Sequence, residues 1–277
     1  MSPPTNPKAG HFDGPSTNRA RGSPRTLAIV AGIISITLGS AAALTLAFTA
    51  ATNTPSGAIV RPIGPGPPGP QDGQTPSPSV VAEARGSSVA VFASPSSRDP
   101  SEVLPSPTSS GDPLIFLVSG PTLESAWLRV YLPQRPNNSQ GWVHTNAVTL
   151  SADDYSVAVN LSTHTMTVFS DGLEMMSTSV GEGQSALPTP TGRFFIVDLL
   201  KQPDPTGEYG PYAFGLSAFS DVLQSFGGGP GEIGIHGTDN PKSVGASLSH
   251  GCIRVPNATI VALAALLPLG TPVLISR

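Results

Sequence analysis

The clearest pattern in the chain is the alternation of apolar and polar residues after residue 153. Residues 155–161 and 165–169 both alternate with a period of two, which is typical of strands with one buried face. Similar runs at 174–180, 193–197 and 271–275 predict further strands. The pattern therefore predicts a mostly β domain over residues 153–277.

One segment of this region departs from the two-residue period. Residues 258–267 are apolar throughout and rich in Ala and Leu, which predicts a single C-terminal helix. Asn257 directly precedes this run and is the expected N-cap. Gly270 is expected to end the helix before the last strand.

Shorter β-like runs precede this domain, at residues 89–92, 114–118 and 128–132. Loops rich in Pro and Ser separate them, and several short strands with turn signals between them are typical of a small barrel or sandwich. The pattern therefore predicts a separate small β module over residues 80–150.

The N-terminal region has a different composition. Residues 27–48 carry no charge and are apolar or small, a length sufficient to cross about 30 Å of hydrocarbon. Because signal-peptide cores are shorter, about 7–15 residues, we expect an uncleaved transmembrane anchor over residues 27–51. The basic residues precede it, which predicts a disordered cytoplasmic tail over 1–26. Residues 52–79 read as a Pro/Gly/Ser linker.

Composition and charge narrow the possible functions. The 277 residues include 31 Pro and 30 Gly, and the net charge is only −4, with no basic face that would indicate nucleic acid as a partner. Cys252 is the only cysteine, so it is either an inert buried residue or a free thiol with a task. No spaced Cys/His cluster is present, and neither a metal nor a cofactor is expected.

Two short segments favour the second interpretation of the cysteine. Residues 233–238 read Ile-Gly-Ile-His-Gly-Thr, and residues 249–254 read Ser-His-Gly-Cys-Ile-Arg. A cysteine nucleophile needs a base within hydrogen-bond reach, and a neighbouring His or positive charge helps to form the thiolate. Local spacing alone favours His250 as the base, because residues two apart in an extended segment face the same way.

These two segments resemble the active-site signature of the L,D-transpeptidase family, also called the YkuD domain. The resemblance is carried by His236-Gly-Thr-Asp-Asn-Pro and Ser249-His-Gly-Cys-Ile-Arg, and by an upstream Val-Gly-Glu-Gly and Thr-Pro-Thr-Gly-Arg-Phe pair at residues 180–183 and 189–194. It covers about residues 155–277. It implies a YkuD-type β-sandwich catalytic domain with a C-terminal helix.

The resemblance implies a mechanism. Cys252 would attack the peptide bond before the terminal D-Ala of a peptidoglycan stem tetrapeptide, releasing D-Ala and leaving a thioester. The amine of a second stem would resolve it to a 3→3 crosslink. His236 would be the base, with its tautomer set by the carbonyl of Gly237. Backbone N–H groups of Gly251 and Cys252 would form the oxyanion hole, and His250 would assist positioning.

Further residues are substrate-binding candidates. Arg254 could hold a substrate carboxylate or form a structural ion pair, and the sequence favours neither. Residues 200–232 resemble the substrate-covering flap of the family, which predicts a lid. Ser249 is expected to act mainly through a hydroxyl bond to its own loop. The other candidates are Tyr212, Thr238 and Asn257.

Four interpretations of function remain open from the sequence. The main one is a transpeptidase whose partners are donor and acceptor stem peptides, tethered to the cell membrane by a single span with its catalytic domain facing the wall. An L,D-carboxypeptidase would use water as the acceptor, a wall-binding scaffold would catalyse no reaction, and a cysteine hydrolase would act on protein. The run at 127–133, followed by Gly141-Trp-Val143, resembles a bacterial SH3-like module, which would bind the wall or serve as a packed spacer.

Overall fold

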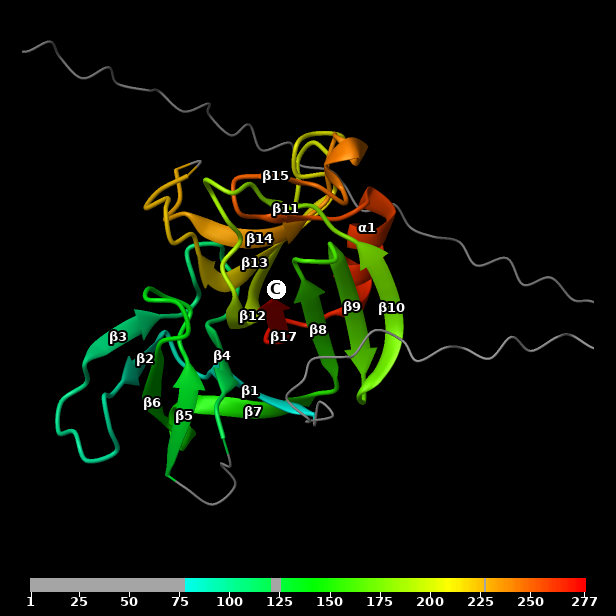
Figure 1. The fold of residues 1–277 in the computed structure, drawn as a ribbon. Coiled ribbons are helices and arrows are strands. Elements are labelled where there is room, and N and C mark those ends of the chain that lie inside the picture. Colours follow the sequence, from blue (N-terminus) through cyan, green and yellow to red (C-terminus); the bar gives the residue numbers. More distant parts are fainter. Residues whose placement is uncertain (1–77, 121–125, 227) are drawn as a thin grey trace, which may run out of the picture. The chain divides into compact units, whose positions relative to one another are not determined.

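In a computed structural model of the chain, residues 78–120, 126–226 and 228–277 are described (Figure 1). The chain divides into two units, Met1–Gly64 and Pro65–Arg277, and all described residues belong to the second. The predicted cytoplasmic tail and membrane span lie outside the described residues, as does nearly all of the predicted linker. Among the helices of the described part, none is long and apolar enough to cross a membrane.

The N-terminal module is built on a five-stranded antiparallel sheet with the order β6-β5-β4-β1-β7, beside a β2–β3 hairpin. Each predicted run of this region falls on a strand, while the resemblance to an SH3-like module stays a prediction. The elements are β1 (Ser79–Ala84), β2 (Ser88–Val91), β3 (Glu102–Pro105), β4 (Ile115–Val118), β5 (Trp127–Tyr131), β6 (Gln140–His144), the 3-10 turn η1 (Thr145–Ala147) and β7 (Val148–Asp153).

The second module is an eight-stranded mixed sheet with the order β10-β9-β8-β17-β12-β13-β14-β16. Neighbours are antiparallel except for the β17–β8 and β14–β16 pairs, which are parallel. Its strands are β8 (Tyr155–Asn160), β9 (Thr165–Ser170), β10 (Leu173–Ser179), β12 (Gly192–Lys201), β13 (Tyr212–Phe219), β14 (Glu232–His236), β16 (Ile253–Arg254) and β17 (Pro272–Ser276). The remaining elements are β11 (Glu182–Gly183), η2 (Pro241–Ser243), β15 (Ser247–Ser249) and the helix α1 (Asn257–Leu266).

The expected mostly β architecture is confirmed, and Figure 1 shows β8, β9 and β10 side by side at the end of the sheet opposite to β14. The residues that alternate in the sequence point into the core: Val157 and Val159 of β8 and Val168 of β9 are at most 2% exposed. Their burial follows from the two-residue period, because alternate side chains of a strand lie on the same face.

The segment predicted as a lid, residues 200–232, contains the strand β13 and two long connections on either side of it, and its role as a lid stays a prediction. β12 continues to Lys201 and β13 pairs with it along its length, so only the connections around β13 are loops. Phe214 and Leu216 anchor β13 in the core with no more than 1% of their surface exposed. β13 was not predicted as a strand, because Gly215 interrupts its apolar residues and masks the strand pattern.

The helix lies one residue earlier than predicted and its cap differs. Pro256 is the N-cap residue of α1, and Asn257 is its first helical residue with no capping hydrogen bond. The side chain of Asn257 does not cap the helix, and its amide oxygen makes another contact instead, described below. The helix ends at Leu266, so Pro268 rather than Gly270 follows its C-terminus, as proline cannot continue a helix.

The two modules share a small apolar core. Val81, Ile115 and Leu117 of the first module pack with Phe195 of β12, and all four are at most 4% exposed. A buried hydrogen bond of 2.8 Å from Thr271 Oγ1 to Asp153 Oδ2 crosses the same boundary. The first module is therefore packed on the second sheet.

Candidate active site

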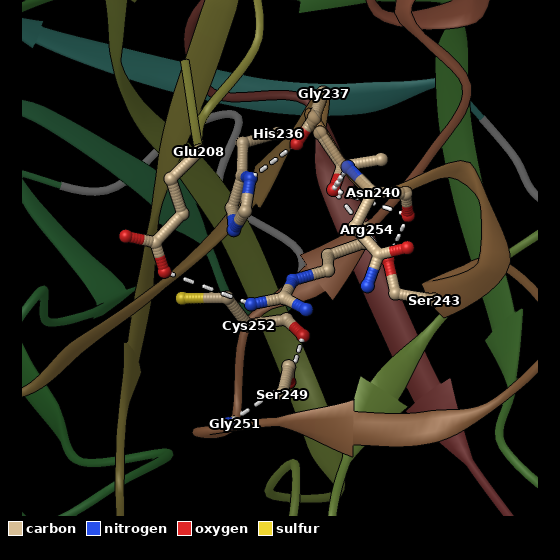
Figure 2. A network of polar contacts seen from close by, with 10 residues as sticks. Glu208, His236, Gly237, Asn240, Ser243, Ser249, Gly251, Cys252 and Arg254 are labelled. Carbon is tan, nitrogen blue, oxygen red and sulfur yellow. Dashed lines mark hydrogen bonds and ion pairs between the residues drawn. The ribbon is translucent and has the colours of Figure 1, made fainter.

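The two motif segments meet on neighbouring strands. β14 pairs with β16 in parallel, with His236 opposite Arg254, and the N–H of Val255 donates to the carbonyl of His236 at 2.9 Å. This pairing brings the His-Gly-Thr and His-Gly-Cys segments together although 14 residues lie between Gly237 and Cys252 in the chain. Figure 2 shows residues of these two segments and the polar contacts among them.

Cys252 lies beside β14 at Gly234, where the strand carries no side chain. The N–H of Gly234 donates to Cys252 Sγ at 3.4 Å, and Cys252 is half-buried. Gly234 and His236 lie two apart on β14 and therefore share one face of the strand. Figure 2 shows the side chains of Cys252, His236 and Arg254 gathered at this point.

His236 is buried, with 3% of its surface exposed, and its ring has a defined tautomer. Its Nδ1 lies 2.5 Å from the carbonyl oxygen of Gly237, which can only accept a hydrogen bond. Nδ1 therefore carries the proton and Nε2 is left as an unprotonated acceptor. Burial lowers the pKa of His236 to about 4, opposed by the Gly237 bond and assisted by the charge of Arg254. The contact predicted between His236 and the Gly237 carbonyl is present.

A rigid turn supports His236 from behind. The N–H of Thr238 donates to Asn257 Oδ1 at 2.7 Å, and Ser243 Oγ donates to the carbonyl of Asn240 at 2.7 Å. A Cβ added to Gly237 would collide with Asn257 Oδ1, so the close approach requires glycine. Thr238 and Asn257, predicted as substrate-binding residues, thus lie behind the histidine and hold its turn.

The cysteine sits in a second cross-linked turn. Ser249 Oγ accepts from the N–H of Gly251 at 3.1 Å and donates to the carbonyl of Cys252 at 2.6 Å. Gly251 has a φ of +123°, a conformation open to glycine alone. The expected loop bond of Ser249 is confirmed. Its consequence differs from the prediction, since the N–H of Gly251 is already engaged and is not free for an oxyanion.

Thr189 completes this turn and was not singled out from the sequence. Its Oγ1 donates to the carbonyl of Gly251 at 2.8 Å and accepts from the N–H of Gly183 at 2.9 Å, and the residue is 2% exposed. The Thr-Pro-Thr-Gly segment marked this loop, although only the fold reveals that its first threonine buttresses the cysteine turn.

The electrostatics of the site favour neutral groups. Burial raises the pKa of the Cys252 thiol, an effect that the Gly234 N–H and the Arg254 charge oppose without overcoming it. In the same setting His236 is held unprotonated. Within the described residues no hydrogen bond joins the thiol to the imidazole, a common state of unliganded catalytic pairs. The resting pair is therefore thiol and neutral imidazole.

Arg254 lies beside the thiol and reaches an exposed partner. Its Nη2 is 3.7 Å from Glu208 Oε1, and the side chains are 13% and 55% exposed respectively. The buried Nε of Arg254 has no hydrogen-bond partner in the described part of the chain. The ring of Tyr209 next to Glu208 lies 4.8 Å from that of His236. The ion-pair alternative therefore has a partner, although a loose one.

The remaining predicted residues lie at the margins. His250 is exposed, and its ring packs on Phe226 with centroids 5.2 Å apart. Among the described contacts nothing joins His250 to Cys252. Tyr212 packs against the core, and its carbonyl accepts from the N–H of Gly237 at 3.4 Å. No group of three or more His, Cys, Asp or Glu that could bind a metal occurs in the described residues.

Glu232, at the start of β14, is a further residue that the sequence did not reveal. Burial, with a smaller contribution from the nearby carboxylate of Asp198, raises its pKa to about 7. Its negative charge in turn raises the pKa of Cys252. The only sequence signal is its position two residues before Gly234, on the face that also bears His236.

Comparison with known proteins follows this geometry. The family profile of the YkuD L,D-transpeptidase catalytic domain matches residues 154–275. A putative L,D-transpeptidase YkuD of Bacillus subtilis is 35% identical over 123 residues, which cover 44% of this chain and 66% of the relative. A putative L,D-transpeptidase YqjB of the same organism is 33% identical over 138 residues, which cover 46% of this chain and 73% of the relative.

Among solved structures, an Enterococcus faecium L,D-transpeptidase aligns at 25% identity with a TM-score of 0.34, covering 44% of this chain and 50% of that one. A Mycobacterium tuberculosis L,D-transpeptidase aligns at 15% identity with a TM-score of 0.39, covering 59% and 91% respectively. The chain thus spans about two thirds of the YkuD relative and half of the Enterococcus protein.

Proposed function

The chain belongs to the L,D-transpeptidase (YkuD) family, and from this premise we propose that it forms 3→3 crosslinks between peptidoglycan stem peptides. The observation that carries the proposal is the position of a buried, neutral His236 at the end of β14, with the only thiol of the chain directly before the paired strand β16. A scaffold that only binds the wall has no need of an imidazole with a fixed tautomer beside a thiol.

In the proposed acylation step, His236 Nε2 takes the proton of Cys252 Sγ as the sulfur attacks the carbonyl carbon before the terminal D-Ala. The carbon–nitrogen bond breaks, His236 returns the proton to the leaving amine, and D-Ala departs from a Cys252 thioester. Because both groups are neutral at rest, proton transfer accompanies attack and no thiolate is formed beforehand.

The oxyanion assignment follows the hydrogen bonds of the cysteine turn. Since the N–H of Gly251 donates to Ser249, we assign the oxyanion to the backbone N–H of Cys252. The N–H of Gly234, which points at Sγ in the resting site, is a second donor in the same place. Arg254 adds positive charge on the same side and is the proposed contact for a substrate carboxylate.

In the second half of the reaction the amine of an acceptor stem attacks the thioester carbonyl. His236 Nε2 accepts the proton of the attacking amine, the carbon–sulfur bond breaks, and the thiol is restored. Water would give the carboxypeptidase reaction by the same steps, so the acceptor decides between the two. The transpeptidase is proposed because it is the activity of the family.

The test is the intact mass of full-length protein in detergent, incubated with a tetrapeptide stem and an amine acceptor, for wild type and Cys252→Ala. We expect loss of D-Ala, a thioester adduct and a crosslinked dimer in wild type alone, with turnover reduced about 10⁴-fold or more in the variant. Tripeptide without dimer would reassign the chain as a carboxypeptidase. Turnover by Cys252→Ala would overturn the mechanism.

We also propose that the enzyme is held at the outer face of the cell membrane by residues 27–51. The support is the uncharged run of residues 27–48, preceded by basic residues. Intact cells treated with an external protease should lose the catalytic domain while retaining a membrane-bound N-terminal fragment. Release of the mature protein into the medium would contradict an uncleaved anchor.

A further inference from the structure

One turn of the N-terminal module reaches across to the catalytic domain and binds a loop there by its backbone. The turn connects β5 with β6 and contains Arg135. Arg135 Nη1 donates to the carbonyl of Ser220 at 2.7 Å, and Nη2 donates to those of Leu223 at 2.8 Å and Pro230 at 3.0 Å. A guanidinium that spans three carbonyls fixes their separation, because its donors are held in a rigid plane.

Neighbouring residues of the same turn add to this attachment. Asn137 accepts from the N–H of Phe219 at 2.8 Å and donates to the carbonyl of Phe219 at 2.7 Å. Asn138 Oδ1 accepts from the N–H of Arg193 at 3.0 Å, at the start of β12. The guanidinium of Arg135 also lies 5.2 Å from the ring of Phe219, within the range of a cation–π contact.

The bound loop, here called the Phe226 loop, comprises residues 220–226 and 228–231. Its ends are closed by a 2.8 Å bond from the N–H of Ser220 to the carbonyl of Gly231, next to the Arg135 contacts. At its tip, Phe226 remains 40% exposed although it is aromatic, and its ring packs on His250, two residues before Cys252. Arg135 holds the base of the loop, and Phe226 contacts the active-site segment at its tip.

We propose that Arg135 is a positioning residue for the active site, which acts through the Phe226 loop to set the ring of Phe226 against His250 and so shapes the entrance to Cys252. The N-terminal module is then part of the substrate-binding apparatus. An exposed aromatic ring held against His250, two residues before the nucleophile in the chain, suits the aliphatic portion of a stem peptide. The kinetic part of this inference rests on the proposed function.

The first test is a double-mutant cycle on stem-peptide acylation with the full-length protein in detergent. Arg135→Ala and Phe226→Ala should each raise KM about tenfold with kcat within about twofold, since β14 and β16 hold His236 and Cys252 independently. In the Phe226→Ala background, Arg135→Ala should add nothing further. Arg135→Lys should be intermediate, because a point charge cannot span the three carbonyls.

The matched control is Arg129→Ala, which removes an exposed arginine from β5 of the same module. It should leave KM unchanged. Additive effects of the Arg135 and Phe226 substitutions, or an equal effect of Arg129→Ala, would overturn the proposal. If Arg135→Ala does not fold, the comparison of Arg135→Lys with Phe226→Ala carries the same test.

A second test does not depend on activity. His250 resonances, assigned by loss in His250→Gln, should shift when Phe226→Ala removes the ring current of the packed phenyl group, and Arg135→Ala should shift them in the same direction. His236 resonances should stay in place in both variants. Unmoved His250 resonances in Arg135→Ala would overturn the positioning role, even if the protein proved to have a different substrate.

Discussion

The two histidines of the motif segments occupy opposite kinds of surroundings. His236 is buried on a sheet strand, with one ring nitrogen bonded to Gly237 and a cross-linked turn behind it. His250 is exposed in a turn, and its described ring contact is Phe226 on a loop bound by the other module. The difference fits the proposed division of labour, in which the sheet builds the proton-transfer pair and loops of both modules build the surface that meets the substrate.

The largest expected effect tests this division directly. His236→Ala should lower kcat for acylation about 10³-fold with little change in KM, because it removes the proposed general base. His250→Ala should lower kcat less than about tenfold and act mainly on KM. Both are measured as rates of D-Ala release over a range of stem-peptide concentrations up to saturation. A larger loss of kcat in His250→Ala would reverse the two roles.

The pH dependence provides the next test. Because the pKa of His236 is about 4 and that of Cys252 is raised, the neutral pair persists across neutral pH, and kcat/KM should be flat from about pH 5 to 8. Activity should fall only as pH approaches about 4, where the imidazole gains its proton. A fall centred near the ordinary histidine pKa, about 6.5, would indicate that an exposed histidine is the base.

A smaller effect is expected from the turn behind His236. Asn257→Ala leaves the buried N–H of Thr238 without its acceptor, which should reduce the free energy of unfolding by about 1–3 kcal/mol. The looser turn should also reduce kcat, by about tenfold, through misorientation of the imidazole. Urea unfolding and D-Ala release measure the two effects. Asn146→Ala, on the other module, is the control and should change neither.

The smallest effect distinguishes the alternatives for Arg254. Glu208→Gln removes a partner that is 55% exposed, so it should alter the free energy of unfolding by less than about 1 kcal/mol. If Arg254 receives a substrate carboxylate, the freed guanidinium should lower KM about twofold to threefold, whereas Arg254→Ala should raise it. An unchanged KM in both variants would leave the ion pair as the role of Arg254.

Much of the fold could be predicted from the sequence where the signal was local. The two-residue period of β8 and β9 and the apolar run of α1 located these elements within a residue or two. The Ile-Gly-Ile-His-Gly and Ser-His-Gly-Cys segments identified His236 and Cys252 as candidates, although the strand β14 itself was not predicted. These features depend on neighbouring residues, so a linear pattern is sufficient to find them.

The contacts between distant segments could not be predicted in this way. Arg135 and the carbonyls it binds are separated by 85 or more positions, and no spacing rule connects an arginine with backbone oxygens. Similarly, Ser249 occupies the N–H of Gly251 only because the turn curls back on itself, which removed one expected oxyanion donor. The prediction of Asn257 as the N-cap was wrong, because its side chain accepts a hydrogen bond from the N–H of Thr238 instead.

The opposed titrations of Glu232 and His236, at the two ends of β14, have a consequence for how the fold responds to acid. Glu232 takes up a proton on folding as its pKa rises from 4.5 to about 7, and His236 gives one up as its pKa falls from 6.5 to about 4. The contribution of Glu232 to the free energy of unfolding is present below pH 4.5 and is lost as the pH rises through about 7. That of His236 is present above 6.5 and lost as pH falls through 4. From about pH 4.5 to 6.5 the two proton exchanges cancel, so these residues give the protein a plateau of stability in mildly acidic surroundings.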